Sequence, residues 1–258
     1  MSGRFIPTSI RRQLRQEAGF GCAQCGNPLI EYHHIIPWSE SKVHRPEHMV
    51  ALCGTCHTSI GKLQRSVAYR LKAAPKNIKD GKIHGLLGTD KAQPSFVLGT
   101  NTFIRTPDVF RYFGRTIFKY DVREGQHLIS AYLPRDDFWP ELRIVENDMT
   151  MDTAKFWDVE FRTNYFRVQR KTRETFLEID LRGEHAKVAA DFSIRGQRFI
   201  FDDEQSSIGS SSIQNSTMID CGAGISFGDR GERLMLPNYA QHHSRVGLLR
   251  EGRSIQWI

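Results

Sequence analysis

The sequence predicts an α+β protein in which a small N-terminal metal-binding domain is followed by a mostly antiparallel all-β domain. Two observations carry this prediction. The first is a pair of Cys-x-x-Cys motifs, one at Cys22 and Cys25 and the other at Cys53 and Cys56. The second is the alternation of apolar and polar residues in several segments beyond residue 150, which is typical of strands with one buried face. A chain of 258 residues is long enough for two such domains.

The N-terminal elements can be predicted in order. Ile10, Leu14 and Ala18 share one face of a short helix that ends near Gly19. Beyond it we expect a cysteine turn over residues 21–27, a strand or tight hairpin over 28–36, a polar loop over 38–46, and a helix over 55–71. Residues 73–82 are basic and contain Pro75 and Gly81, so they resemble a connector. We therefore place one domain at residues 1–88 and a second at residues 89–258.

Three segments of the second domain alternate most clearly. They are residues 157–162, 177–181 and 187–194, and each predicts a strand of an antiparallel sheet. No motif in this domain points to a chemical activity. We expect it to serve in sensing, partner binding or assembly.

The positive charge is concentrated near the N-terminus. The whole chain has a net charge of +7, but residues 1–89 hold 13 Lys and Arg against 5 Asp and Glu, a net +8. The remaining residues are close to neutral. Because basic segments gain affinity for phosphates by releasing counterions, the distribution favours a nucleic-acid partner for the first domain. A solvated surface would show the same charge.

The composition also bears on the compartment. No apolar run is long enough to cross a membrane, and the first residues lack the pattern of a secretory signal. Four of the five cysteines fall in the two Cys-x-x-Cys motifs, which leaves Cys221 outside them. In a reducing compartment such motifs indicate metal before disulfide. We expect a cytoplasmic protein without membrane contact.

The four paired cysteines predict a structural zinc site. Zinc prefers four thiolates in tetrahedral geometry, and one tight Cys-x-x-Cys turn supplies two of them. The 27 residues between the pairs are more than a simple finger needs, so the ion would close a loop that contains a hairpin. Such a site has no open coordination position, and its expected role is to stabilise the fold. Four buried thiols without metal are the alternative.

Histidines are interleaved with these cysteines. His33 and His34 lie between the pairs, and His57 follows the last cysteine. These side chains are of the kind that a hydrolytic metal site needs. The runs Glu31–Pro37 (EYHHIIP), Glu47–Cys53 (EHMVALC) and Cys56–His57 together resemble the HNH endonuclease family, over roughly residues 8–65.

The resemblance implies a ββα-metal fold and a role for each motif histidine. It implies that His33 binds a catalytic divalent metal, that His34 is the general base, and that His57 is a second metal ligand. The chain departs from the family pattern at His48, where Asn is usual. His48 could be a third ligand, a brace for the loop, or a surface residue. The expected catalytic ion is Mg²⁺, Mn²⁺ or Ni²⁺, and three imidazoles would favour the softer ions.

Other candidates surround this motif. Glu31 could orient His33 or His34, or point to solvent, and we expect His44 in the polar loop to be solvated. The candidate phosphate contacts share a basic side chain near the motif: Arg11, Arg12, Arg15, Lys42, Arg45, Lys62 and Arg65.

The resulting hypothesis is a metal-dependent endonuclease that hydrolyses phosphodiester bonds in DNA. By analogy with prokaryotic proteins of this organisation, it would act in defence or restriction. The alternatives are a non-catalytic zinc protein that binds nucleic acid and a nuclease that acts on RNA. A homodimer formed through the β-rich domain would bring two sites to opposite strands.

Overall fold

The structure is a computed structural model. This structure describes residues 5–60, 64–88, 93–135 and 139–227, and the backbone of two short strands at 234–235 and 240–241. The chain divides into two compact units. Unit 1 comprises residues 1–85, 150–163 and 168–172, and unit 2 comprises residues 86–149, 164–167 and 173–258. The domain boundary at residue 88 stays a prediction.

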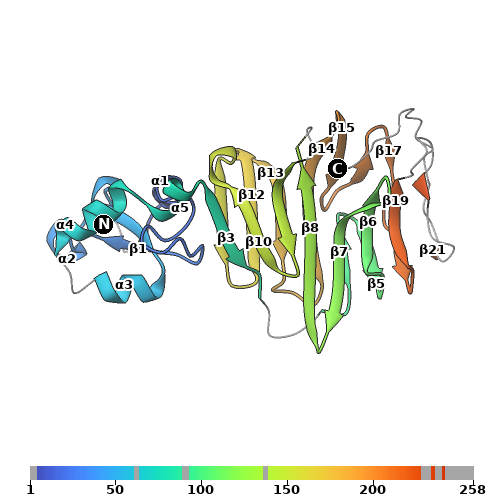
Figure 1. Ribbon diagram of the computed structural model, residues 1–258, viewed down its shortest axis with the longest axis horizontal. Coiled ribbons are helices and arrows are strands. Elements are labelled where there is room, and N and C mark those ends of the chain that lie inside the picture. The colour runs from blue at the N-terminus through green and yellow to red at the C-terminus, as the bar shows by residue number, and fades with distance from the viewer. Residues whose placement is uncertain are drawn as a thin grey trace. The chain divides into compact units, whose positions relative to one another are not determined.

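All α-helices that the structure describes lie in the first part of unit 1, residues 5–85 (Figure 1). Its elements are α1 (Thr8–Glu17), β1 (Glu31–His34), α2 (Trp38–Ser41), the 3-10 helix η1 (Pro46–His48), β2 (Met49–Leu52), α3 (Gly54–Ile60), α4 (Arg65–Ala73) and α5 (Lys76–Asp80). Helix α1 follows Pro7, and Gly19 with φ +64° lies just beyond its end. Glycine suits this position because it adopts the left-handed conformation without strain.

Strands β1 and β2 form the central hairpin of this part. They pair antiparallel, with Glu31 opposite Leu52 and His34 opposite Met49. All four residues of β2 are buried. A small core surrounds them and includes Ile35, Ile60 and three of the cysteines. The hairpin therefore holds the histidine pair of β1 against a packed strand.

Helix α2 lies within the predicted polar loop of residues 38–46. Two further elements differ from the sequence-based expectations. The predicted single helix over residues 55–71 is wrong, because Gln64 has an extended ψ of 144° and separates α3 from α4. The predicted connector contains helix α5, whose Asn77 is buried. Both differences concern short segments whose conformation depends on tertiary contacts more than on local propensity.

The strands after residue 81 form two sheets. The first has the order β20-β19-β6-β7-β8-β9-β10-β3, and the second has the order β11-β12-β13-β14-β4-β5-β18-β21, with β15, β16 and β17 attached to β14. Their bounds are β3 Lys82–Leu86, β4 Phe96–Leu98, β5 Asn101–Ile104, β6 Asp108–Tyr112, β7 Arg115–Arg123, β8 Gln126–Pro134, β9 Pro140–Val145, β10 Asp148–Asp152, η2 Thr153–Lys155, β11 Asp158–Arg162, β12 Tyr165–Lys171, β13 Glu174–Asp180, β14 Ala186–Ile194, β15 Gln197–Phe201, β16 Ser206–Ile208, β17 Ser211–Ser212, β18 Thr217–Ile219, β19 Ala223–Phe227, β20 Leu234–Met235 and β21 Ala240–Gln241.

Most of these pairings are antiparallel. The exceptions among the described registers are β4 with β14, β5 with β18 and β6 with β19, which run parallel. The alternation predicted for residues 187–194 is present in β14, where Val188, Ala190, Phe192 and Ile194 are buried. The α+β fold class with mostly antiparallel sheets is confirmed.

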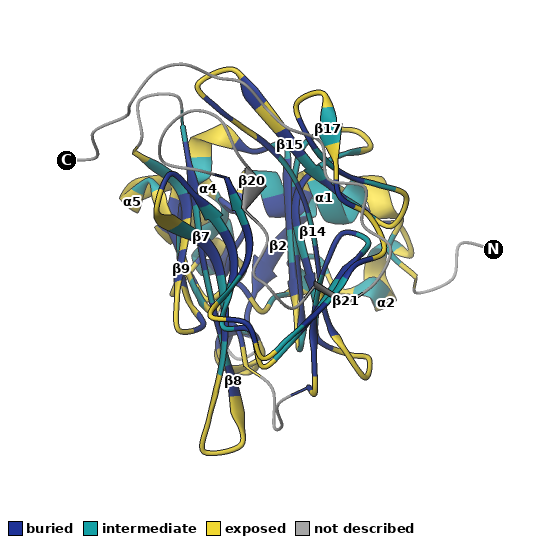
Figure 2. Cartoon of the chain, turned by 90° about the vertical axis from the view of Figure 1, so that its right-hand side faces the viewer, coloured by how far each residue is buried: buried dark blue, intermediate teal, exposed yellow. Residues whose placement is uncertain are grey.

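Aromatic side chains join the two sheets within unit 2. Phe110 on β6 lies 5.5 Å from Phe199 on β15, and Phe118 on β7 lies 6.1 Å from Phe192 on β14, measured between ring centroids. Figure 2 shows strands such as β7 and β14 mostly as buried or intermediate, and the connecting turns as exposed. Burial of these rings contributes apolar stabilisation to unit 2.

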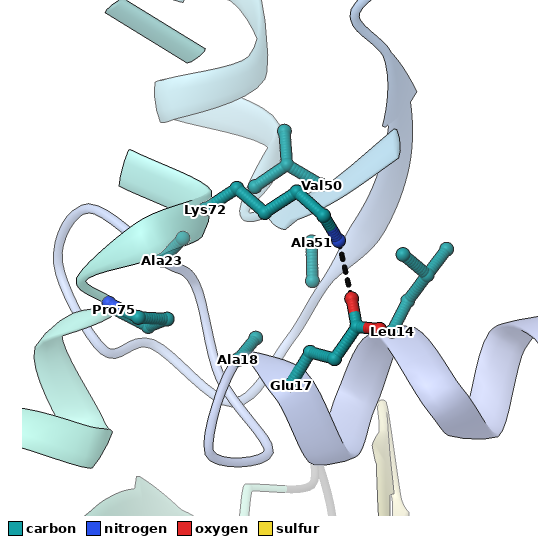
Figure 3. A pocket seen from close by; sticks show the side chains of 8 residues that line it. All are labelled: Leu14, Glu17, Ala18, Ala23, Val50, Ala51, Lys72 and Pro75. Carbon is teal, nitrogen blue, oxygen red and sulfur yellow. Dashed lines mark hydrogen bonds and ion pairs between the residues drawn. The ribbon is translucent and has the colours of Figure 1, made fainter. Parts of the chain in front are cut away.

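A small pocket of unit 1 lies among α1, β2 and α4 (Figure 3). Two of the residues that line it, Lys72 and Glu17, form an ion pair. The space measures about 10 Å³, which is room for about one water molecule. This pocket is too small for a substrate, and the candidate chemistry lies elsewhere in unit 1.

Candidate functional site

The four paired cysteines gather into one cluster beside the hairpin. The first turn closes through hydrogen bonds from the amide of Cys22 to the carbonyl of Asn27 and from the amide of Gly26 to the carbonyl of Cys22. All four Sγ atoms lie within 4.8 Å of one another. The Sγ atoms of Cys25 and Cys53 are 3.6 Å apart.

This geometry fits a zinc ion. Four thiolates at the usual Zn–S distance of about 2.3 Å stand about 3.8 Å apart, close to the 3.6 Å between Cys25 and Cys53. The four thiols are not joined in disulfides. Burial raises the pKa of Cys56, and a bound cation would offset that cost by favouring the thiolate. In the described part of the chain, no other set of three or more His, Cys, Asp or Glu ligands is grouped closely enough to hold an ion.

Asn77 on α5 holds the first cysteine turn in place. Its side-chain amide donates to the carbonyls of Gly19 and Gly26, each at 3.1 Å, and the residue is 4% exposed. Gly26 has φ +84°, and a Cβ there would meet the Asn77 Oδ1 atom at 2.4 Å. Sequence reasoning missed this residue, because nothing local distinguishes it from a polar linker residue.

His33 and His34 have different partners, because successive residues of a strand point to opposite faces. The His33 ring meets the ring of His57 edge-on, with centroids 4.9 Å apart. The His34 Nε2 atom lies 3.0 Å from Nδ1 of His44. The hairpin and α3 thus bring His33 and His57 together, while the loop after β1 supplies the partner of His34.

Glu31 contacts His57 rather than either member of the histidine pair. Its Oε2 atom lies 2.7 Å from His57 Nδ1. This contact leaves Nε2 of His57 as the ring nitrogen available to a metal. The sequence left open whether Glu31 orients His33 or His34. In the structure, its carboxylate contacts His57 instead.

His48 lies on η1 and contacts Tyr69 of α4. Its Nδ1 atom is 2.8 Å from the Tyr69 hydroxyl. The structure does not group His48 with His33 and His57 as a set of three ligands. The contact with Tyr69 matches the bracing alternative for this position, and metal binding by His48 stays a prediction.

The surroundings of His33 and His34 lower the pKa of both rings and so favour the neutral form. Burial lowers the pKa of His33, and the charges of His57 and His34 lower it further. Burial also lowers the pKa of His34, with a smaller contribution from His44. Neutral imidazoles are the form that binds a metal or takes a proton. The environment therefore suits both predicted roles.

The predicted phosphate contacts fall into different environments. Arg15 is 6% exposed and forms a bidentate ion pair with Asp158, at 2.9 and 2.6 Å, so the prediction that it contacts phosphate is wrong. The Arg12 guanidinium lies over the Trp157 ring, 4.2 Å from its centroid.

The remaining basic candidates lie nearer the surface. Arg11 is half-buried, Arg65 pairs with Glu40 at 2.5 Å, Lys42 and Arg45 are exposed, and Lys62 lies outside the described residues. Lys42 and Arg45 are thus the most accessible cations of the loop that carries His44.

Comparison with known proteins identifies the N-terminal segment. Residues 22–63 match the family model of the HNH endonuclease, and this segment contains both cysteine turns and all five histidines described above. Comparisons with curated proteins and with solved structures gave no match. Among the described residues, no helix is long and apolar enough to cross a membrane. The segment of residues 22–63 is therefore similar to the HNH endonuclease family.

Proposed function

We propose that this protein is a metal-dependent endonuclease that hydrolyses phosphodiester bonds in DNA. The observation that carries the proposal is the placement of His33 and His57, with ring centroids 4.9 Å apart, next to a separately partnered His34. One strand thus supplies a ligand to one face and a base to the other. The family match over residues 22–63 supports the reaction class.

The residues divide the chemistry between them. His33 and His57 would hold a divalent cation, with Glu31 orienting the His57 ring. When bound, such a cation polarises the phosphate and stabilises negative charge on the departing oxygen. His34 takes the proton from the attacking water, and the burial that lowers its pKa favours the neutral ring that this role needs.

The ligand set bears on the choice of metal. Two imidazoles leave most coordination positions to oxygen atoms of water and phosphate, which Mg²⁺ and Mn²⁺ accept. If His48 left Tyr69 and joined as a third imidazole, Ni²⁺ or Mn²⁺ would be favoured over Mg²⁺. Titration of activity with each ion therefore tests the role of His48.

The proposed substrate is DNA because the part of the chain with the site is basic. Lys42 and Arg45 are exposed beside it, and contacts of this kind recognise phosphates without regard to sequence. RNA presents the same phosphates. Parallel assays on duplex DNA and single-stranded RNA distinguish the two substrates.

The first test uses supercoiled plasmid and zinc-loaded protein with added Mg²⁺, Mn²⁺ or Ni²⁺. His34→Ala is compared with wild type, and His84→Ala is the matched control because His84 is an exposed histidine of β3. We expect wild type and His84→Ala to nick the plasmid, and His34→Ala to lose at least about 100-fold in rate, the low end for a lost general base.

Each other result has a distinct meaning. Equal cleavage by wild type and His34→Ala would refute the base assignment. Retained binding of DNA without cleavage by any metal would favour the non-catalytic zinc protein. Cleavage of RNA alone would refute DNA as the substrate.

We further propose that the β-rich region serves assembly or sensing in a prokaryotic defence or restriction role. Its charge is nearly neutral, which argues against a second strong nucleic-acid surface. A homodimer would place two sites on opposite strands. Light scattering tests this, and a monomer that cuts both strands in one encounter would refute it.

A further inference from the structure

The loop after β1 contains a buried histidine that the family motif does not assign. His44 is 8% exposed, although a histidine in a polar loop is expected to be solvated. Its Nδ1 atom lies 3.0 Å from Nε2 of His34. A buried imidazole costs free energy unless its nitrogens are hydrogen-bonded. The fold therefore places His44 against the proposed general base.

An aromatic side chain fixes the orientation of His44. Trp38, the first residue of α2, stacks on the His44 ring with centroids 4.5 Å apart and an interplanar angle of 26°. The same indole meets the His34 ring edge-on at 5.7 Å. Lys42 ends α2 in the left-handed conformation, with φ +50°, and the chain then turns back to bring His44 over the indole. The three rings form one packed group.

The hydrogen bond between the two imidazoles has one donor and one acceptor. If His34 donates from Nε2 to Nδ1 of His44, the lone pair of His34 is on Nδ1 and can accept a proton. If His44 donates from Nδ1, the neutral His34 carries its proton on Nδ1 and has no lone pair there for water. The tautomer of His44 therefore decides which nitrogen of His34 is basic.

We propose that His44 is a positioning residue that holds His34 in one orientation, with its Nε2 protonated and its Nδ1 basic. The proposal rests on the proposed function, because the value of a fixed tautomer is in proton transfer from water. It assigns no contact with substrate to His44. Trp38 supports the arrangement by restricting the His44 ring.

The first test observes the hydrogen bond without any cleavage assay. In ¹⁵N-labelled, zinc-loaded protein we expect a through-hydrogen-bond coupling between His34 Nε2 and His44 Nδ1, and an Nε2 proton on His34 that exchanges slowly with solvent. His34 protonated on Nδ1, or no coupling between the two nitrogens, would overturn the proposal. This measurement remains informative if the protein proves not to be a nuclease.

The second test compares two substitutions of His44. His44→Asn places an amide oxygen near the position of Nδ1 and keeps an acceptor for His34, whereas His44→Leu removes it. We expect His44→Leu to lose about 10–100-fold in kcat, the range for partners that orient a functional side chain. His44→Asn should recover most of this loss, and KM should change little in both variants.

Controls separate positioning from folding. Both variants should keep the zinc content and thermal midpoint of His84→Leu, which alters an exposed histidine. Full activity of His44→Leu would overturn the proposal. So would an inactive, folded His44→Asn, because an acceptor alone would then be insufficient. An inactive wild type would refute the proposed function, and the ring coupling would still test the hydrogen bond.

Discussion

The ion pair between Arg15 and Asp158 allows a quantitative prediction about the stability of unit 1. The side chains are 7% and 5% exposed, and two hydrogen bonds join them at 2.9 and 2.6 Å. Arg15 also donates to the Tyr32 hydroxyl at 2.9 Å. The two partners are 143 residues apart in the sequence, and both belong to unit 1.

Asp158→Asn removes the negative partner and leaves the Arg15 cation buried. A hydrogen bond to a charged group contributes about 1.5–3 kcal/mol, and two such bonds are weakened. The expected loss is about 3–5 kcal/mol, which is also the range for breaking a buried ion pair from one side. The double variant Arg15→Met with Asp158→Leu should recover much of this loss, because no charge is left unpaired.

Urea unfolding followed by circular dichroism and tryptophan fluorescence measures the change. Asp220→Asn is the matched control, because it breaks a bidentate pair with Arg105 that is exposed, and it should leave the unfolding midpoint unchanged. A loss below about 1 kcal/mol for Asp158→Asn would refute the reasoning, since that is the value of an exposed pair. So would a double variant no more stable than the single one.

Three further predictions concern the metal sites. Cys53→Ser should lose the bound zinc and the helical signal of unit 1, and a zinc content equal to wild type would contradict the four-thiolate site. Gly26→Ala should lower the free energy of unfolding by about 2–3 kcal/mol, because alanine is strained in the left-handed backbone of residue 26 and its Cβ would weaken the hydrogen bond from Asn77 to the carbonyl of residue 26. An unchanged urea midpoint would show that the turn relaxes freely. Glu31→Gln should weaken Mn²⁺ binding by about 10–100-fold in calorimetry on zinc-loaded protein, and equal affinities would mean that Glu31 does not orient His57.

Local patterns predicted the elements that depend on local chemistry. Alternation in residues 187–194 predicted β14, because one face of the strand packs on the core. The Cys-x-x-Cys spacing predicted a group of four thiols, because each turn supplies two neighbouring ligands. The predicted helix over residues 55–71 failed at Gln64, where the backbone is extended despite a helical apolar spacing.

Long-range contacts account for the partners that were missed. In the sequence, nothing distinguishes Arg15 from the other basic residues of α1. Its partner Asp158 lies 143 residues away in the sequence. His44 had no motif around it, and its burial depends on the turn after α2 and on the Trp38 ring. Asn77 belonged to an apparent connector, yet it bonds to a carbonyl 51 residues away.

The sequence by itself determined which metal-ligating side chains this protein has and how they are spaced along the chain. Four thiols in two tight turns and two histidines on opposite faces of one strand follow from local geometry alone. Only the tertiary structure decided the partner of each histidine: His57 beside His33 and Glu31, His44 beside His34, and Tyr69 beside His48. The physical reason is that a side chain's partner depends on where distant segments cross. Its chemical type is given by the sequence, and the face of the strand to which it points follows from the local backbone.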